Sequence, residues 1–208
     1  MSSIAKPRVA ILISGRGSNM VSLVEASKAP GYPAEIVLVL SNRPDAPGLA
    51  YAEGAAIATA TIEHRAFPDR EAFDGALGAE FAAHRIDLVC LAGFMRILTP
   101  GFVGRWRGRM LNIHPSLLPA FKGLHTHARA IEAGVVRHGC TVHWVVPELD
   151  SGPIVAQAAV PVLPDDDEPT LAARVLAAEH RLYPEALATV AREMSLADSR
   201  GSGIDQSR

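Results

Sequence analysis

Short, strongly apolar segments recur along the first half of the chain, and each is followed by a polar loop and then a helical pattern. Three of them cover residues 9–13, 36–40 and 86–92, and a fourth, 110–114, is apolar at its start. Strands that are apolar on both faces are typical of parallel sheets covered by helices on both sides. The alternation therefore predicts an α/β fold of Rossmann-like type, with a mostly parallel, twisted sheet and helices on both faces.

The pattern changes toward the C-terminus. Segments 138–146 and 154–162 both have strand character, and the seven-residue connection 147–153 joins them. A connection this short favours an antiparallel pair, because a parallel crossover needs a longer one. We expect residues 1–194 to form a single domain and the polar, glycine-containing segment 195–208 to be a disordered tail.

The composition argues against several classes of function. The chain has 208 residues, of which 49% are hydrophobic, and a formal net charge of −2, so it has no overall attraction to nucleic acid or to anionic membranes. Cys90 and Cys140 lie inside apolar segments, which is typical of reduced cysteines in a cytoplasmic protein. The sequence has no Cys/His cluster with metal-ligand spacing, so we expect no metal.

A glycine loop follows the first predicted strand. The sequence Ser-Gly-Arg-Gly-Ser-Asn occupies 14–19 and leads into a helical pattern. A strand, a glycine loop and a helix together point backbone N–H groups at an anion. Met20 stands where a dinucleotide fingerprint has its third glycine, and no acid follows the second strand at 41–43, so a phosphate site fits better. An ordinary glycine turn is an equally weighted alternative.

The fourth predicted strand ends in polar residues. Asn112 and His114 lie on one face of it, because side chains alternate along a strand, and Pro115 keeps the backbone extended. An amide can stabilise an oxyanion, and an imidazole can move a proton near neutral pH. A buried pair of hydrogen-bonded polar residues is the alternative.

Four polar or loop features follow strands and should therefore meet. Ligands bind at the carboxyl ends of the strands in open α/β sheets. This edge gathers the glycine loop, the apolar loop 94–98, the pair Asn112 and His114, and Asp150 in the connection before the last strand. The alternative for Asp150 is a simple turn former, which is the usual role of Asp-Ser-Gly.

The group Asn112, His114 and Asp150 suits acyl transfer to a nucleophile that the substrate itself brings. Asn112 and a protonated His114 would stabilise the oxyanion, and Asp150 would favour the imidazolium form. The sequence has no GxSxG motif, and neither cysteine has a catalytic context. We therefore expect direct transfer without a covalent enzyme intermediate.

Five segments carry a resemblance to a known family, which runs in register from about residue 8 to residue 192. They are ISGRGSN (13–19), AGFMRIL (92–98), LNIHPSLLP (111–119), GLHTH (123–127) and ELDSGP (148–153). Together they resemble the phosphoribosylglycinamide formyltransferase family within the 10-formyltetrahydrofolate transferases.

The resemblance implies a reaction and a set of roles. A formyl group would pass from 10-formyltetrahydrofolate, used as co-substrate, to the amino group of glycinamide ribonucleotide in purine biosynthesis. His114 would be the proton donor, Asn112 the oxyanion partner, and Asp150 the residue that supports the imidazolium. The residues implied for the ribonucleotide are Gly17, Ser18, Asn19 and Glu179. Those implied for folate are Arg70, Met95, Arg96, Ile97, Leu98, Asn112, Val146, Pro147, Glu148, Leu149 and Asp150.

Two alternatives for the function remain open. A formyltetrahydrofolate hydrolase would send the same formyl group to water, and we disfavour it because its relatives carry an extra N-terminal domain. A non-catalytic nucleotide-binding module would use only the glycine loop. We expect cytoplasmic localisation, small-molecule substrates, and neither nucleic acid nor membrane as a partner, and we leave a homodimer open.

Overall fold

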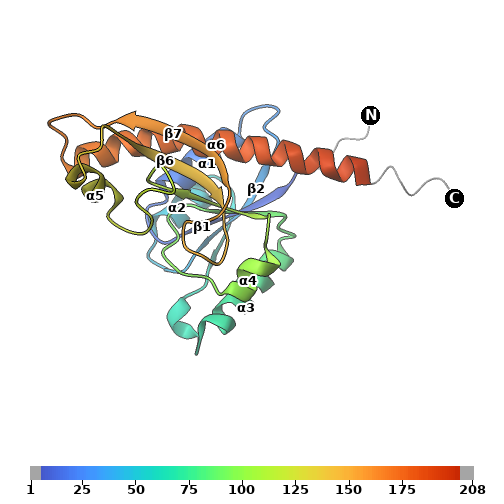
Figure 1. Ribbon diagram of the computed structural model, residues 1–208. Coiled ribbons are helices and arrows are strands. Elements are labelled where there is room, and N and C mark those ends of the chain that lie inside the picture. Colours follow the sequence, from blue (N-terminus) through green and yellow to red (C-terminus); the bar gives the residue numbers. More distant parts are fainter. Residues whose placement is uncertain (1–5, 202–208) are drawn as a thin grey trace.

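The computed structural model describes residues 6–201, and its strands form one sheet in the order β3-β2-β1-β4-β5-β6-β7 (Figure 1). The strands are β1 (Arg8–Ile13), β2 (Glu35–Ser41), β3 (Ala58–Thr61), β4 (Leu88–Leu91), β5 (Met110–His114), β6 (Arg137–Trp144) and β7 (Ile154–Pro161). β1 to β5 are parallel, whereas β6 is antiparallel to both β5 and β7. The predicted fold class and the antiparallel β6–β7 pair are confirmed.

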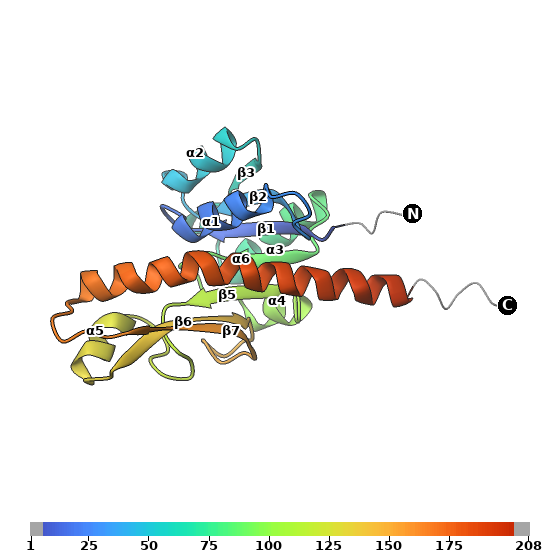
Figure 2. The ribbon, with the colours of Figure 1, turned by 90° about the horizontal axis from the view of Figure 1, so that it is seen from above.

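Helices cover both faces of the sheet. They are α1 (Ser18–Ser27), α2 (Pro47–Gly54), α3 (Arg70–Ala83), α4 (Pro100–Arg105), α5 (Thr126–Glu132) and α6 (Glu168–Gly201), with a 3-10 turn at His64–Ala66. The side chains of α1, α2 and α6 share one buried apolar cluster with the sheet, and those of α3 and α4 share the other. Figures 1 and 2 show α6 running along the first face and α3 and α4 on the second. Among the described residues, every helix is too short or too polar to span a lipid bilayer.

Local sequence signals explain where two of these helices begin. The Asp69 side chain accepts a hydrogen bond from the backbone N–H of Ala72 and caps α3. The Thr99 hydroxyl accepts one from Phe102 N–H, and Pro100 is the first residue of α4. Both caps agree with the sequence.

The C-terminal segment differs in part from the expected disordered tail. α6 continues without a break to Gly201, so residues 195–201 are helical and not disordered. The hydroxyl of Ser195 donates to the carbonyl of Ala191 one turn earlier, as in a continuing helix. Residues 202–208 and the first five residues lie outside the described part, and a single domain ending at 194 stays a prediction.

A tyrosine of α6 holds the ends of two central strands. The Tyr183 side chain is fully buried, and its hydroxyl lies 3.1 Å from the carbonyl oxygen of Leu91 and 3.2 Å from that of Leu111. Leu91 is the last residue of β4, and Leu111 lies in β5 just before Asn112. This one side chain therefore attaches α6 to the two strands whose ends lead into the candidate site.

Replacement Tyr183→Phe should lower the free energy of unfolding by about 1 kcal/mol, because the buried carbonyls of Leu91 and Leu111 lose their hydroxyl donor. Urea unfolding measures this value. Tyr32→Phe is the matched control, since the Tyr32 hydroxyl also bonds to a carbonyl, that of Pro184, but at a half-buried position. Equal losses in the two variants would contradict the assigned importance of Tyr183.

Candidate active site

The pairing of β5 with β6 brings the predicted Asn112 and His114 next to side chains of β6. Asn112 lies opposite His143 and His114 lies opposite Thr141 in the antiparallel register. His114 is 6% exposed and His143 is 3% exposed, whereas Asn112 is half-buried. The polar end of β5 therefore faces a largely dry environment, in which charges and hydrogen bonds act strongly.

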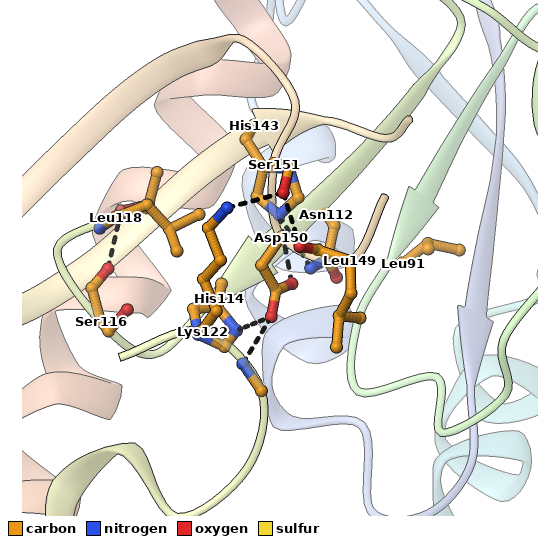
Figure 3. Close-up of polar contacts among 12 residues, drawn as sticks. Leu91, Asn112, His114, Ser116, Leu118, Lys122, His143, Leu149, Asp150 and Ser151 are labelled. Atoms are coloured by element: carbon orange, nitrogen blue, oxygen red, sulfur yellow. Dashed lines mark hydrogen bonds and ion pairs between the residues drawn. The ribbon is translucent and has the colours of Figure 1, made fainter. Parts of the chain in front are cut away.

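Asp150 reaches the same place from the loop between β6 and β7 (Figure 3). Its carboxylate is buried, and the backbone of Asp150 has a φ of +49°. Oδ2 lies 3.4 Å from Nδ1 of His114 and accepts the backbone N–H of Gly123 at 2.9 Å. Oδ1 lies 3.8 Å from Nε2 of His143. The carboxylate thus lies between two histidine rings and accepts a hydrogen bond from a backbone donor.

Both ring nitrogens of His114 face acceptors. Nδ1 faces the Asp150 carboxylate, and Nε2 lies 3.0 Å from the carbonyl oxygen of Phe121. Because a carboxylate and a carbonyl only accept, this arrangement suits an imidazolium that donates from both nitrogens. The structure therefore brings Asn112, His114 and Asp150 together, as the sequence indicated.

His143 has the opposite character. Its Nδ1 lies 3.0 Å from the carbonyl oxygen of Trp144, to which it donates, and its Nε2 accepts from the side-chain amide of Asn112 at 3.1 Å. Burial lowers the pKa of His143 below its ordinary value, against the raising effects of the Trp144 carbonyl and Asp150. A neutral ring with the proton on Nδ1 satisfies both neighbours, and it turns the nitrogen of the Asn112 amide, not its oxygen, toward His143.

A cavity of about 130 Å³ adjoins this group. Most of the residues implied for folate line it, namely Arg96, Ile97, Leu98, Asn112, Val146, Pro147, Leu149 and Asp150. Of the remaining three, Met95 lines a neighbouring polar cavity of about 520 Å³, and Arg70 lines a third cavity of about 190 Å³. Glu148 lines none of these cavities. Arg96 lines all three cavities, so they lie next to one another around its side chain.

The glycine loop leads into α1, whose N-terminus has no side-chain cap. Gly17 occupies the N-cap with φ +68°, and Ser18 is the first helical residue. Asn19 donates through Nδ2 to Oε2 of Glu179 at 2.6 Å, while its Oδ1 is buried without a hydrogen-bond partner. Burial raises the pKa of Glu179 above its ordinary value, although the bond from Asn19 opposes this. The four residues implied for the ribonucleotide therefore lie together at the start of α1.

Metal ligation finds no support in the part of the chain that the structure describes. Among residues 6–201, no group of three or more His, Cys, Asp or Glu side chains is arranged to hold a metal ion. His127, one of the two histidines in the segment 123–127, instead lies 3.2 Å from the Nε2 of His138 through its Nδ1.

Comparisons with known proteins agree with this geometry. A family model described as formyl transferase matches residues 7–187. The chain is 49% identical over 176 residues to phosphoribosylglycinamide formyltransferase of Escherichia coli, covering 85% of this chain and 83% of that protein. The chain belongs to the phosphoribosylglycinamide formyltransferase family.

Solved structures of the formyltransferase family share the fold. The crystal structure of phosphoribosylglycinamide formyltransferase from Brucella melitensis is 55% identical, with a TM-score of 0.87, and the match covers 90% of this chain and 96% of that one. The family also includes parts of longer proteins. The chain is 50% identical over 198 residues to a trifunctional purine biosynthetic protein of Drosophila melanogaster, but it spans only 15% of that protein's length. The family resemblance seen in the sequence is confirmed.

Sequence reasoning missed His143. The structure places it beside both Asn112 and Asp150, yet in the sequence it is one of several polar residues in a predicted strand. Only the β5–β6 register identifies it, because that register puts it opposite Asn112. The only sequence signal for His143 is a histidine in the strand that follows the Asn-Ile-His segment. That signal does not say which residue of β5 lies opposite it.

His143 should titrate below its ordinary pKa of about 6.5 and carry its proton on Nδ1 when neutral, because burial disfavours its charged form. Since the unfolded chain takes up that proton at the ordinary value, His143 should also reduce folding stability as the pH falls below it. Ring ¹⁵N NMR during a pH titration measures the midpoint and the tautomer.

Replacement His143→Gln assigns the resonance, because one histidine signal disappears. A midpoint at or above the ordinary value, or a proton on Nε2 of the neutral ring, would contradict the assignment of His143 as the acceptor for Asn112.

Proposed function

We propose that the chain transfers a formyl group from 10-formyltetrahydrofolate to the amino group of glycinamide ribonucleotide, giving the N-formyl product and tetrahydrofolate in purine biosynthesis. Membership of the formyltransferase family supports this reaction. The observation that carries it is the grouping of Asn112, His114 and Asp150, of which Asn112 and Asp150 line a cavity with apolar walls and His114 pairs with Asp150. These groups are the ones that a direct acyl transfer needs.

The ribonucleotide is bound at the glycine loop. Backbone N–H groups at the uncapped start of α1 bind the phosphate, with Gly17 allowing the close approach and Ser18 adding a hydroxyl. The helix dipole favours the anion in the same position. Asn19 and Glu179 contact the rest of this substrate, which is supported by the buried, unpartnered Oδ1 of Asn19.

The formyl donor occupies the cavity beside Asn112. Apolar side chains of the 94–98 loop and of Val146 and Leu149 form its walls, which suits the flat ring system of a folate. Arg70 and Arg96 both line the neighbouring cavity of about 190 Å³, which suits the carboxylates of the folate tail.

The reaction follows from these positions. The substrate amine attacks the formyl carbon, and the negative charge that develops on the formyl oxygen accepts hydrogen bonds. His143 uses one N–H of the Asn112 amide, and the second N–H remains for this oxygen. The bond from the formyl carbon to N10 of the folate then breaks, N10 takes up a proton, and the former amine loses one.

His114 supplies the proton in this scheme. Its ring has a carboxylate on one side, and Asp150 is itself kept in place by the Gly123 N–H. The proton on Nε2, donated to Phe121 in the structure, is the one directed away from Asp150. The leaving nitrogen takes this proton when it replaces the Phe121 carbonyl as the partner of Nε2.

We place this reaction in the cytoplasm with small molecules as its substrates. Cys90 and Cys140, which are both free and buried, support a reducing compartment.

A spectrophotometric assay of 10-formyltetrahydrofolate consumption, with and without glycinamide ribonucleotide, tests the proposed function. Consumption only in the presence of the ribonucleotide is expected. Equal consumption without it would identify a hydrolase, and no consumption in either case would leave only a binding module.

Replacement His114→Ala should reduce kcat by a factor on the order of 10²–10⁴, because the proton donor is lost. Steady-state assays measure kcat, and circular dichroism checks the fold. The matched control is His84→Ala, since His84 pairs with Glu80 of α3 and precedes the amino end of β4, at the edge of the parallel strands opposite to the one that carries His114. Near-normal turnover in the first variant would refute the role of His114.

Replacement Ser18→Ala should raise the KM for the ribonucleotide about tenfold, since one hydrogen bond to a charged group is lost, and should leave the KM for the formyl donor nearly unchanged. Ser27→Ala is the control, because the Ser27 hydroxyl donates to the Val24 carbonyl at the far end of the same helix. Equal effects on both KM values would argue against a phosphate site at this loop.

A further inference from the structure

One buried hydroxyl joins the loops that follow β1 and β4. Ser14 is the first residue after β1 and is 8% exposed. Its Oγ accepts a hydrogen bond from the backbone N–H of Met95 at 2.8 Å and donates to Oδ1 of Asn42 at 2.5 Å. β1 and β4 are neighbours in the sheet, at the point where the strand order reverses. The hydroxyl thus connects the start of the glycine loop to the 93–98 loop.

The donors and acceptors in this group fix one another. The Met95 N–H can only donate, so it uses a lone pair of Ser14, and the hydroxyl proton then goes to Oδ1 of Asn42. This orients Nδ2 of Asn42 toward Nδ1 of His64 at 3.2 Å, which accepts. Asn42 is 4% exposed and follows β2, and His64 opens the turn after β3. The chain of hydrogen bonds crosses the carboxyl ends of four adjacent strands.

The 93–98 loop depends on few fixed points. The side chains of Phe94 and Leu98 are buried in the apolar cluster on the α3 and α4 face. Those of Met95 and Ile97 are 63% and 65% exposed. Beyond its end, the N–H of Thr99 donates to the buried carboxylate of Asp74 at 2.7 Å. Between the two buried side chains, the hydrogen bond to Ser14 sets the direction of the backbone at Met95. That direction decides where the exposed part of the loop lies.

We infer that Ser14 is a positioning residue that sets the folate-binding 93–98 loop relative to the phosphate-binding glycine loop. The inference rests on the proposed function, because it assigns each loop to one substrate. Ser14 lines the polar cavity of about 520 Å³ with Met95 and Arg96, but its hydroxyl is already engaged by Asn42 and by the Met95 N–H. Ser14 acts through Met95. Asn42 accepts the hydroxyl proton of Ser14 and so keeps that proton directed away from the Met95 N–H.

Replacement Ser14→Ala should raise the KM for 10-formyltetrahydrofolate about tenfold at saturating ribonucleotide, because the loop loses its backbone anchor. Wild-type protein is assayed first, since absence of formyl transfer there would refute the proposed function and not the anchor. An active wild type with an unchanged KM in Ser14→Ala would refute the anchor alone. Ser27→Ala, which removes a serine hydroxyl bond outside the site, should match the wild type.

A double-mutant cycle separates positioning from general destabilisation. Ile97→Ala should raise the KM for the formyl donor in the wild type, and by a smaller factor when Ser14→Ala has already displaced the loop. Amide hydrogen exchange at Met95 should accelerate in Ser14→Ala while urea unfolding of the whole chain changes little. Additive KM effects, or unchanged exchange at Met95, would overturn the inference.

Discussion

The antiparallel contact between β5 and β6 is the constraint on which the candidate site depends. In that register Asn112 lies opposite His143 and His114 lies opposite Thr141. A shift by one residue would turn every side chain of one strand to the other face of the sheet. The Asn112 amide would then lose the ring that orients it. Tyr183 of α6 bonds to the carbonyl of Leu111 next to Asn112, so the helix and the sheet fix the same short piece of backbone.

The buried Asp150 carboxylate has partners that are provided by fixed backbone and by a ring. A buried carboxylate without partners is costly. Here Gly123 donates a backbone N–H, and His114 offers a ring nitrogen to the same oxygen. The loop that carries Asp150 can approach β6 this closely because residue 152 is a glycine. A Cβ at that position would collide with the carbonyl of Trp144. The acid is therefore held by the turn and not only by its charge.

The sequence predicted the strands and helices better than the register between neighbouring strands. The run 110–114 is a local signal, and it forms β5 as predicted. The strand ends that carry Asn112, His114 and Asp150 could be grouped because parallel strands end at one edge. His143 could not be found, since its role depends on a register between strands that the sequence does not encode locally. The helical course of 195–201 was also missed, because its polar composition resembles that of a tail.

In the proposed function, both substrates bind near the edge where β1 meets β4. The loops after these two strands leave the sheet side by side, and Ser14 ties one to the other through Met95. A transfer without a covalent intermediate requires the amine and the formyl carbon to meet in one geometry, so the two binding loops must keep a fixed distance. We infer that the Ser14 hydroxyl is that restraint, because it donates to Asn42 and accepts from the Met95 N–H. A serine side chain is also small enough to fit between the two loops. Under the proposed function, one edge of the sheet therefore both binds the two substrates and aligns them for the transfer.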